Sequence, residues 1–367
     1  MKEFLKKEPV LVSAVFLAGF SAILVKPSYE YISYIDFGVL SLLFCLMVVV
    51  SGLQSIGVFD FLASYLMKYM KNIRQFYLIM VSLCFFSSMI ITNDVALITF
   101  IPFTIMILTS LNRKDKLISI IVLETIAANL GSMLTPIGNP QNLYIYTVSH
   151  MSLLKFIGVM LPITVISYMI LFIMVWLGTK KNETIDMQLS IKEVEDKRRF
   201  LLYVFLFALC IGTVLHLISY VVLTVIVIFG AMISDKHLMK KVDYSLLVTF
   251  IAFFIFIGNM QHMEFVQTII QRRMADNTIL FAVISSQFIS NVPAAVLLSG
   301  FTKDYVELLI GVNIGGLGTL IASMASLISY RYYVGVHNHD AKKYISVFTM
   351  ANVVFLVLLL TTIPIIK

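Results

Sequence analysis

Apolar runs close to twenty residues long recur along the whole chain. Of its 367 residues, 60% are hydrophobic and 13% are charged, and the mean hydropathy is +0.96. A hydrocarbon core of about 30 Å needs about 20 helical residues per crossing, and in lipid a helix satisfies its own backbone polar groups. The sequence therefore predicts an all-α polytopic membrane protein.

The runs divide into spans, hairpins and interrupted segments. Predicted spans cover 9–25, 36–55, 152–178, 200–218, 220–234, 243–260 and 344–365. Two hairpins, 75–110 and 278–302, turn at Asn93 and Asn291, and two broken helices cover 116–149 and 305–330. A mixed-charge stretch, 179–199, is predicted to be a cytoplasmic linker between a first repeat, 1–178, and a second repeat, 200–367.

Arm length and charge together predict the topology. The arm 278–289 reaches only about 18 Å at 1.5 Å per helical residue, so that hairpin is expected to re-enter rather than cross. If both hairpins re-enter, the chain has about nine crossings, N-in and C-out. Of the 27 Lys and Arg residues, that topology leaves outside only Lys26, Lys155, Arg272, Arg273, Lys303 and Lys367, in keeping with the positive-inside rule.

The order of motifs repeats between the halves. "IDFGVLSLLF" from Ile35 resembles "VDYSLLVTF" from Val242, "TNDVALIT" from Thr92 aligns with "SNVPAAVL" from Ser290, and "NLGSMLTPIGNPQN" aligns with "NIGGLGTLIASMAS". In the predicted topology the first pair of helices runs in opposite directions, so the repeats are inverted. Inverted repeats with discontinuous helices are typical of secondary transporters whose site lies at the membrane midplane.

Each hairpin tip places polar groups at membrane depth. Thr92, Asn93 and Asp94 form one tip, and Ser290 and Asn291 form the other. Such residues can cap the following arm, whose positive dipole end attracts anions. Capping alone does not explain a carboxylate in a span, because it costs about 2.5–3.5 kcal/mol there on insertion scales. Asp94 is therefore expected to bind Na⁺ or to carry a proton.

The broken helices supply the remaining candidate ligands. Pro136 and Pro140 interrupt the first one, and its other predicted site residues are Asn129, Thr135, Gly138 and Asn139. The candidate ligands of the second broken helix are Asn313, Gly316 and Thr319. A candidate Na⁺ site lies near Asn93, Asp94 and Gly138. The alternatives are an ordinary loop in the first break and glycine-mediated helix packing in the second.

Glu124 is a second coupling candidate, because an intramembrane acid is a functional hypothesis by default. It could equally pair with a hydroxyl or amide of another helix. The sequence has no Walker A motif, nucleotide-binding glycine fingerprint or metal-ligand spacing, so we expect no cofactor other than Na⁺ as a coupling ion and no nucleic-acid partner.

At these motifs the chain resembles the ion transporter superfamily, in its citrate transporter-like, arsenite-efflux and anion-permease branch, related to divalent-anion/sodium symporters. The resemblance implies a scaffold and a transport domain that move as an elevator in a homodimer. The family's Ser-Asn-Thr tips correspond to Thr92, Asn93 and Asp94 and to Ser290, Asn291 and Val292. Asp94 and Val292 replace hydroxyls, which favours proton coupling or a cation role.

The sequence thus predicts a secondary active transporter in the cytoplasmic membrane, not an enzyme. We expect it to move a small inorganic oxyanion or carboxylate, coupled to H⁺ or Na⁺. Arsenite efflux and sodium/proton antiport remain alternatives within this class. An intramembrane enzyme using Asp94 and Glu124, and a passive channel, are alternatives from other classes.

Overall fold

The computed structural model describes residues 9–68, 70–179, 193–194, 196–336 and 340–366, and every regular element among them is helical. The predicted linker 179–199 falls mostly outside these residues. The helices are α2 (Pro9–Leu24), α3 (Glu30–Tyr34), α4 (Phe37–Ser55), α5 (Val58–Met67), α6 (Ile73–Ile91), α7 (Asn93–Ser110), α8 (Leu117–Ser132), α9 (Pro140–Ser149), α10 (Leu153–Gly178), α11 (Lys197–Val214), α12 (Tyr220–Ser234), α13 (Tyr244–Gln261), α14 (Glu264–Ile289), α15 (Asn291–Ser299), α16 (Tyr305–Ile314), α17 (Met324–Val336) and α18 (Ala341–Ile366), with 3₁₀ turns η1 (Lys114–Lys116) and η2 (Lys236–Lys241).

Six of these helices are long and apolar enough to cross a membrane: α4, α6, α7, α10, α13 and α18. Three shorter apolar helices are α2, α12 and α16. The helical, multi-span character is therefore confirmed, whereas nine crossings and N-in/C-out orientation stay predictions.

Two local features differ from the expected segments. α3 was not predicted. α14 starts well before the expected hairpin arm, but its backbone leaves the helical region at Asn277 (φ −167°, ψ 95°). The Asn277 side chain accepts a hydrogen bond from the Leu280 N–H (2.9 Å), as an N-cap does. The arm that reaches the tip is therefore a separately capped helix.

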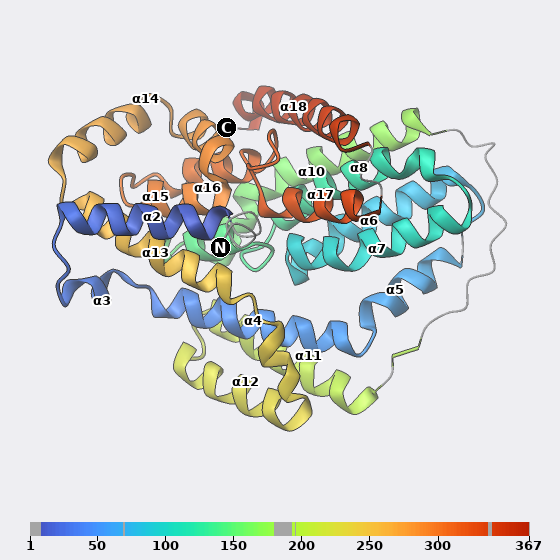
Figure 1. The fold of residues 1–367 in the computed structure, drawn as a ribbon, viewed down its shortest axis with the longest axis horizontal. Helices are drawn as coiled ribbons and strands as arrows, with labels where there is room; N and C mark the ends of the chain where they lie inside the picture. The colour runs from blue at the N-terminus through green and yellow to red at the C-terminus, as the bar shows by residue number, and fades with distance from the viewer. Residues whose placement is uncertain (1–8, 69, 180–192, 195, 337–339, 367) are drawn as a thin grey trace.

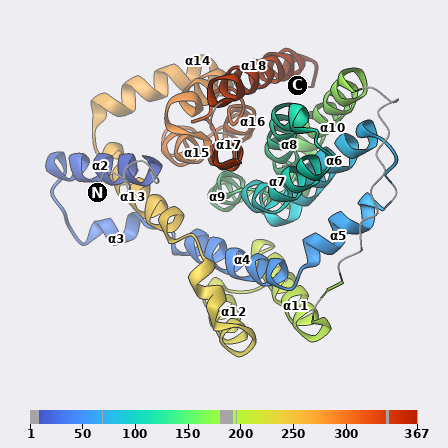
Figure 2. The same ribbon diagram turned by 45° about the vertical axis from the view of Figure 1, so that its right-hand side comes forward.

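The helices form two groups (Figures 1 and 2). We call α2, α3, α4, α11, α12, α13 and η2 the frame, because α4 packs on α11, α12 and α13, and α13 packs on α2 and α3. We call α6–α10 and α14–α18 the bundle. Within the bundle, α8 contacts α6, α7, α10, α17 and α18, and α14–α16 pack on one another. Frame and bundle touch more sparsely, mainly through α13 with α14 and α15 and through α4 with α9.

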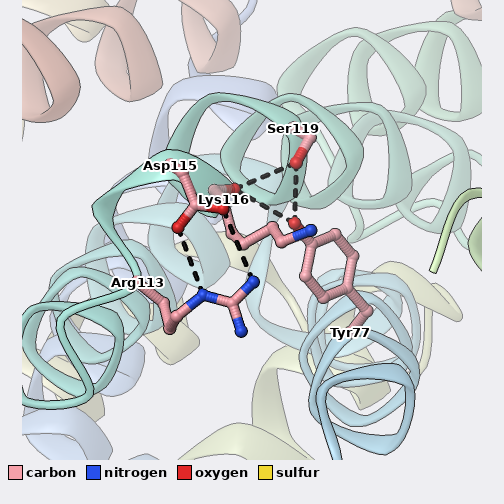
Figure 3. Close-up of polar contacts among 5 residues, drawn as sticks. All are labelled: Tyr77, Arg113, Asp115, Lys116 and Ser119. Atoms are coloured by element: carbon pink, nitrogen blue, oxygen red, sulfur yellow. Dashed lines mark hydrogen bonds and ion pairs between the residues drawn. The ribbon is translucent and has the colours of Figure 1, made fainter. Parts of the chain in front are cut away.

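A polar cluster fastens the N-terminal part of α6 to the turn before α8 (Figure 3). The Tyr77 hydroxyl donates to the Lys116 carbonyl (3.1 Å) and lies 2.6 Å from the Ser119 hydroxyl. Arg113 pairs with Asp115 in the same turn (3.2 Å), and its hydrogen bond lowers the pKa of that exposed carboxyl. The turn between α7 and α8 is thereby fixed against α6.

Above this cluster, α6 and α8 pack backbone to backbone. Gly131 of α8 is buried, and a Cβ there would meet the backbone carbonyl of Phe85 and the side chain of Ser88. Because a backbone carbonyl within a helix cannot move aside cheaply, only glycine fits this crossing.

We predict that Gly131→Ala lowers stability by about 1–3 kcal/mol, the usual cost of overpacking a core. The thermal unfolding midpoint of the detergent-purified protein should fall. The matched control is Gly158→Ala in α10, where a Cβ meets nothing within 4 Å. Equal midpoints for both variants would contradict the close α6–α8 contact.

Candidate functional site

Both hairpin tips hold the same unusual backbone. Thr92, between α6 and α7, has φ 73° and ψ 151°, and Ser290, between α14 and α15, has φ 74° and ψ 154°. This region is almost confined to glycine, and a residue with a side chain costs of order 1–3 kcal/mol there. Such conformations persist only where surrounding contacts impose them, and they cluster at functional sites.

A main-chain hydrogen bond fixes each tip to a broken helix. The Asn93 N–H donates to the Gly138 carbonyl (3.1 Å), and the Asn291 N–H donates to the Ala322 carbonyl (2.9 Å). Gly138 lies in the break between α8 and α9, where a Cβ would strike the Ser132 backbone. Each tip is thus held by the unwound segment of its own half of the chain.

A buried amide network joins the two broken helices to each other. Asn139 caps α9 through the Asn142 N–H (2.8 Å), and its Nδ2 donates to Asn313 Oδ1 (3.3 Å). Asn313 in α16 donates to Asn142 Oδ1 (2.6 Å). Asn142 Nδ2 in turn donates to three carbonyls of the break, those of Ser132, Met133 and Thr135 (3.2, 3.2 and 3.1 Å).

Asn129 of α8 links the first tip to the end of the second break. Its Oδ1 accepts from Asn93 Nδ2 (2.9 Å) and from the Ser323 hydroxyl (3.0 Å). Its Nδ2 is buried and has no partner. A buried, unpaired donor is costly, although Asn129 itself is not among the residues that line the cavity described next.

A cavity of about 410 Å³ opens beside the first tip, between frame and bundle. Thr92, Asp94 and Asn139 line it from the bundle. The frame contributes α4, mostly with apolar side chains, and the residues at the start of α13. Its size suits a small solute, since ligand pockets run from about 300 Å³ upward.

Asp94 is the only acid that α7 presents to this cavity. Its N–H donates to Asn93 Oδ1 (3.0 Å), while its own Oδ1 is shielded from solvent and accepts no hydrogen bond. Asp94 Oδ1, Asn93 Oδ1 and the Gly138 carbonyl are oxygen donors of the kind that bind Na⁺ at unwound helices. The same carboxyl could instead hold a proton.

Glu124 lies elsewhere, fully buried in α8 and outside the lining of this cavity. The Thr104 hydroxyl donates to its Oε1, and its Oε2 has no partner. It precedes Asn129 by five residues, or about 7.5 Å along the helix. Among the described residues, no group of three His, Cys, Asp or Glu side chains could hold a metal ion.

The other predicted residues occupy varied positions. Ser290 and Asn291 are buried, with the Asn291 amide against Gly316, and neither lines the cavity. The Thr135 hydroxyl donates to the Met89 carbonyl, which ties the break to α6. Thr319 is exposed, and its hydroxyl donates to the Gln287 carbonyl (3.1 Å). The structure therefore places its side chain outside the amide network.

The sequence analysis missed several residues of this centre. Gln287 holds the second break open by donating to the carbonyls of Gly315 and Leu317 (both 2.9 Å). Gln54 of α4 donates to the Thr99 hydroxyl of α7 (3.2 Å), a direct contact between frame and bundle. Lys241 and Arg331 line the cavity, although the sequence suggested only that they mark the inner side. The Asn139/Asn142 spacing was a usable signal, because an N-cap bonds the N–H three residues on.

We predict that Asn142→Asp destabilises the protein by at least about 3 kcal/mol, because the new carboxylate faces three carbonyl oxygens that lose their donor. The measurement is the thermal midpoint in detergent. Asn112→Asp, at an exposed turn, is the control and should leave it unchanged. An Asn142→Asp protein as stable as the control would show that the amide network does not hold the breaks together.

The sequence is similar to those of known transporters and of a membrane protein. The citrate transporter family model (CitMHS) matches residues 6–305. The uncharacterized transporter MJ0456 of Methanocaldococcus jannaschii is 35% identical over 291 residues, 79% of each chain. The inner membrane protein YbiR of Escherichia coli is 30% identical over 302 residues, 81% of this chain and 80% of its own. The silicon efflux transporter LSI3 of Oryza sativa is 32% identical over 152 residues, 41% of this chain and 30% of its own.

Proposed function

Since the chain belongs to the citrate transporter family, we propose that it is a secondary active transporter that moves a small anion across the cytoplasmic membrane, driven by H⁺ or Na⁺. The observation that carries the proposal is the cavity between frame and bundle, lined by a strained hairpin tip and an unwound helix. A homodimer is part of the proposal, as it is for the superfamily the sequence resembles.

Equivalent contacts in the two halves support the inverted repeats. Aligning Asn129 with Asn313 pairs Gly138 with Ala322 and Asn139 with Ser323. The tip bonds to Gly138 and Ala322 then correspond. So do the two crossing bonds, Asn139 to Asn313 and Ser323 to Asn129.

The frame shows the same correspondence. Asp36 caps α4 through the Val39 N–H (2.9 Å), and Asp243 caps α13 through the Leu246 N–H (3.0 Å). Further along these helices, Gly52 and Gly258 each leave room for a tyrosine ring. A two-fold relation between the halves accounts for all of these pairs. With re-entrant hairpins we propose nine crossings, and the distribution of Lys and Arg favours N-in and C-out.

The arrangement of the two groups supports an elevator mechanism. The cavity lies at their boundary, and its bundle wall carries the tip and the break. Apolar side chains of α4, among them Leu43, Leu46 and Val50, form the opposite wall. Such a wall offers few hydrogen bonds to hold the bundle, so sliding along it is cheap compared with breaking the amide network.

A neutral hydroxylated acid is a second candidate substrate. The cavity wall formed by α4 is largely apolar, and one relative is named a silicon efflux transporter. A neutral solute would need no charge compensation at the site.

The deciding experiment is transport into proteoliposomes. Labelled citrate, succinate and inorganic phosphate serve as anions and silicic acid as the neutral acid, each with an imposed pH gradient, an imposed Na⁺ gradient or neither. We expect gradient-driven accumulation of at least one anion. No movement of any solute under any gradient would refute the transporter assignment, and flux independent of both gradients would indicate a channel.

We predict that Asn93→Ala and Asn291→Ala each reduce transport at least about tenfold, because the first removes the hydrogen bond to Asn129 Oδ1 and the second removes the amide that packs against Gly316, at tips that face the midplane in transporters of this kind. Expression and monodispersity in detergent should stay near wild type. Asn112→Gly at an exposed turn is the control, because Asn112 has φ 55° and glycine removes the side chain without straining that backbone. Near-normal rates in either tip variant would remove that tip from the site.

We predict that Asp94→Asn keeps the fold but uncouples transport from its driving ion, because the amide can neither release a proton nor offer a carboxylate to Na⁺. The dependence of the uptake rate on pH and on Na⁺ is measured in wild type and variant. An unchanged dependence would leave Asp94 as a helix cap only.

A further inference from the structure

Four charged side chains line the cavity: Asp94 and Arg331 from the bundle, and Lys241 and Asp243 from the frame. Lys241 ends η2, Asp243 caps α13, and Arg331 lies within α17. The frame and the bundle thus contribute one cation each. The remaining lining is largely apolar, but Lys241, Asp243 and Arg331 are exposed and Asp94 is half-buried, so water and salt partly screen these charges.

The two cations are specific to this cavity and are not a feature of the repeats. The repeat alignment pairs Lys241 with Tyr34 and Arg331 with Thr147, both uncharged. The two cations therefore lie outside the contacts that the halves share, unlike the capping pair Asp36 and Asp243. Among the described residues, moreover, the ammonium of Lys241 has no hydrogen-bond or ion-pair partner.

We propose that Lys241 and Arg331 form the anion-recognising side of the transport site, so that the substrate class is an anion rather than a neutral acid or a cation; this rests on the proposed transport function. The anion sits between the two cations and the first tip, which lines the cavity through Thr92 and Asp94. One cation comes from each moving part, so the anion contacts both while the cavity is in this arrangement.

The acids of the cavity give this recognition a link to the driving ion. Asp94 and Asp243, when ionised, offset both cations, so the lining has no net charge. Na⁺ bound at Asp94 leaves the lining with one net positive charge, which favours an anion. Anion and coupling ion should therefore bind cooperatively, as symport requires.

The test compares charge-removing variants with a neighbouring control. Lys241→Gln and Arg331→Gln are reconstituted alongside Lys240→Gln, which removes the same charge one residue away from a side chain outside the cavity lining. For the anion that the wild type carries, KM should rise about three- to tenfold in the first two variants, as expected for losing one partly solvated charge contact. Lys240→Gln should match the wild type, and Arg331→Lys, which keeps the charge, should restore most of the affinity.

The outcomes separate this proposal from the proposed function. If the wild type carries silicic acid or Na⁺ but none of the anions, or if KM for the anion is unchanged in both Gln variants, the anion-recognising role is refuted while transport stands. If Lys240→Gln raises KM as much as the cavity variants, only general surface charge is involved and the proposal falls. If the wild type moves no solute at all, the proposed function fails first.

Discussion

Hydrogen bonds between side-chain amides and unwound backbone position the whole centre of this protein. In lipid, a helix can stop only where other groups satisfy its freed N–H and C=O groups. Asn142 does this for three carbonyls of the first break, and Gln287 does it for two of the second. Since Asn142 also bonds Asn313, the two breaks cannot separate without exposing buried polar groups. Both hairpin tips are bonded in turn to these breaks.

The tips gain their conformation from that same link. Thr92 and Ser290 hold a backbone that glycine would adopt more easily, and the carbonyls of Gly138 and Ala322 impose it. With this backbone, the N–H of the following residue, the first of each arm, faces the carbonyl of the broken helix. One arm then presents Asp94 to the cavity, whereas Val292 takes the corresponding position on the other. In the proposed function, the carboxyl of Asp94, which Val292 lacks, couples transport to H⁺ or Na⁺.

Much of the fold followed from the sequence, because it depends on local and periodic signals. Apolar run length predicted the helices, and prolines and glycines marked the first break. The tips at Asn93 and Asn291 were predicted because a polar pair within an apolar run needs a turn. The roles of Gln287, Gln54, Lys241 and Arg331 were not predictable in this way. Each faces a segment distant in sequence, and a single Gln, Lys or Arg in or beside an apolar helix resembles an ordinary interfacial residue. Thr319 was chosen by alignment with Thr135, and alignment does not show that its side chain lies at the surface.

The frame and the bundle meet along a cavity whose one wall is largely apolar, and the central claim is that they slide past each other there to carry the solute. Gln54 and Thr99 touch across this boundary (3.2 Å), while the three native cysteines are buried. The most direct measurement is therefore transport by a Gln54→Cys/Thr99→Cys protein before and after joining the two thiols with a short, reducible bis-methanethiosulfonate, because the contact is made by the long Gln54 side chain and a direct disulfide needs closer backbones. The account predicts that cross-linking stops transport, that reduction restores it, and that each single-cysteine protein is unaffected by the reagent. Transport at an undiminished rate in the fully cross-linked protein would contradict movement of the bundle against the frame.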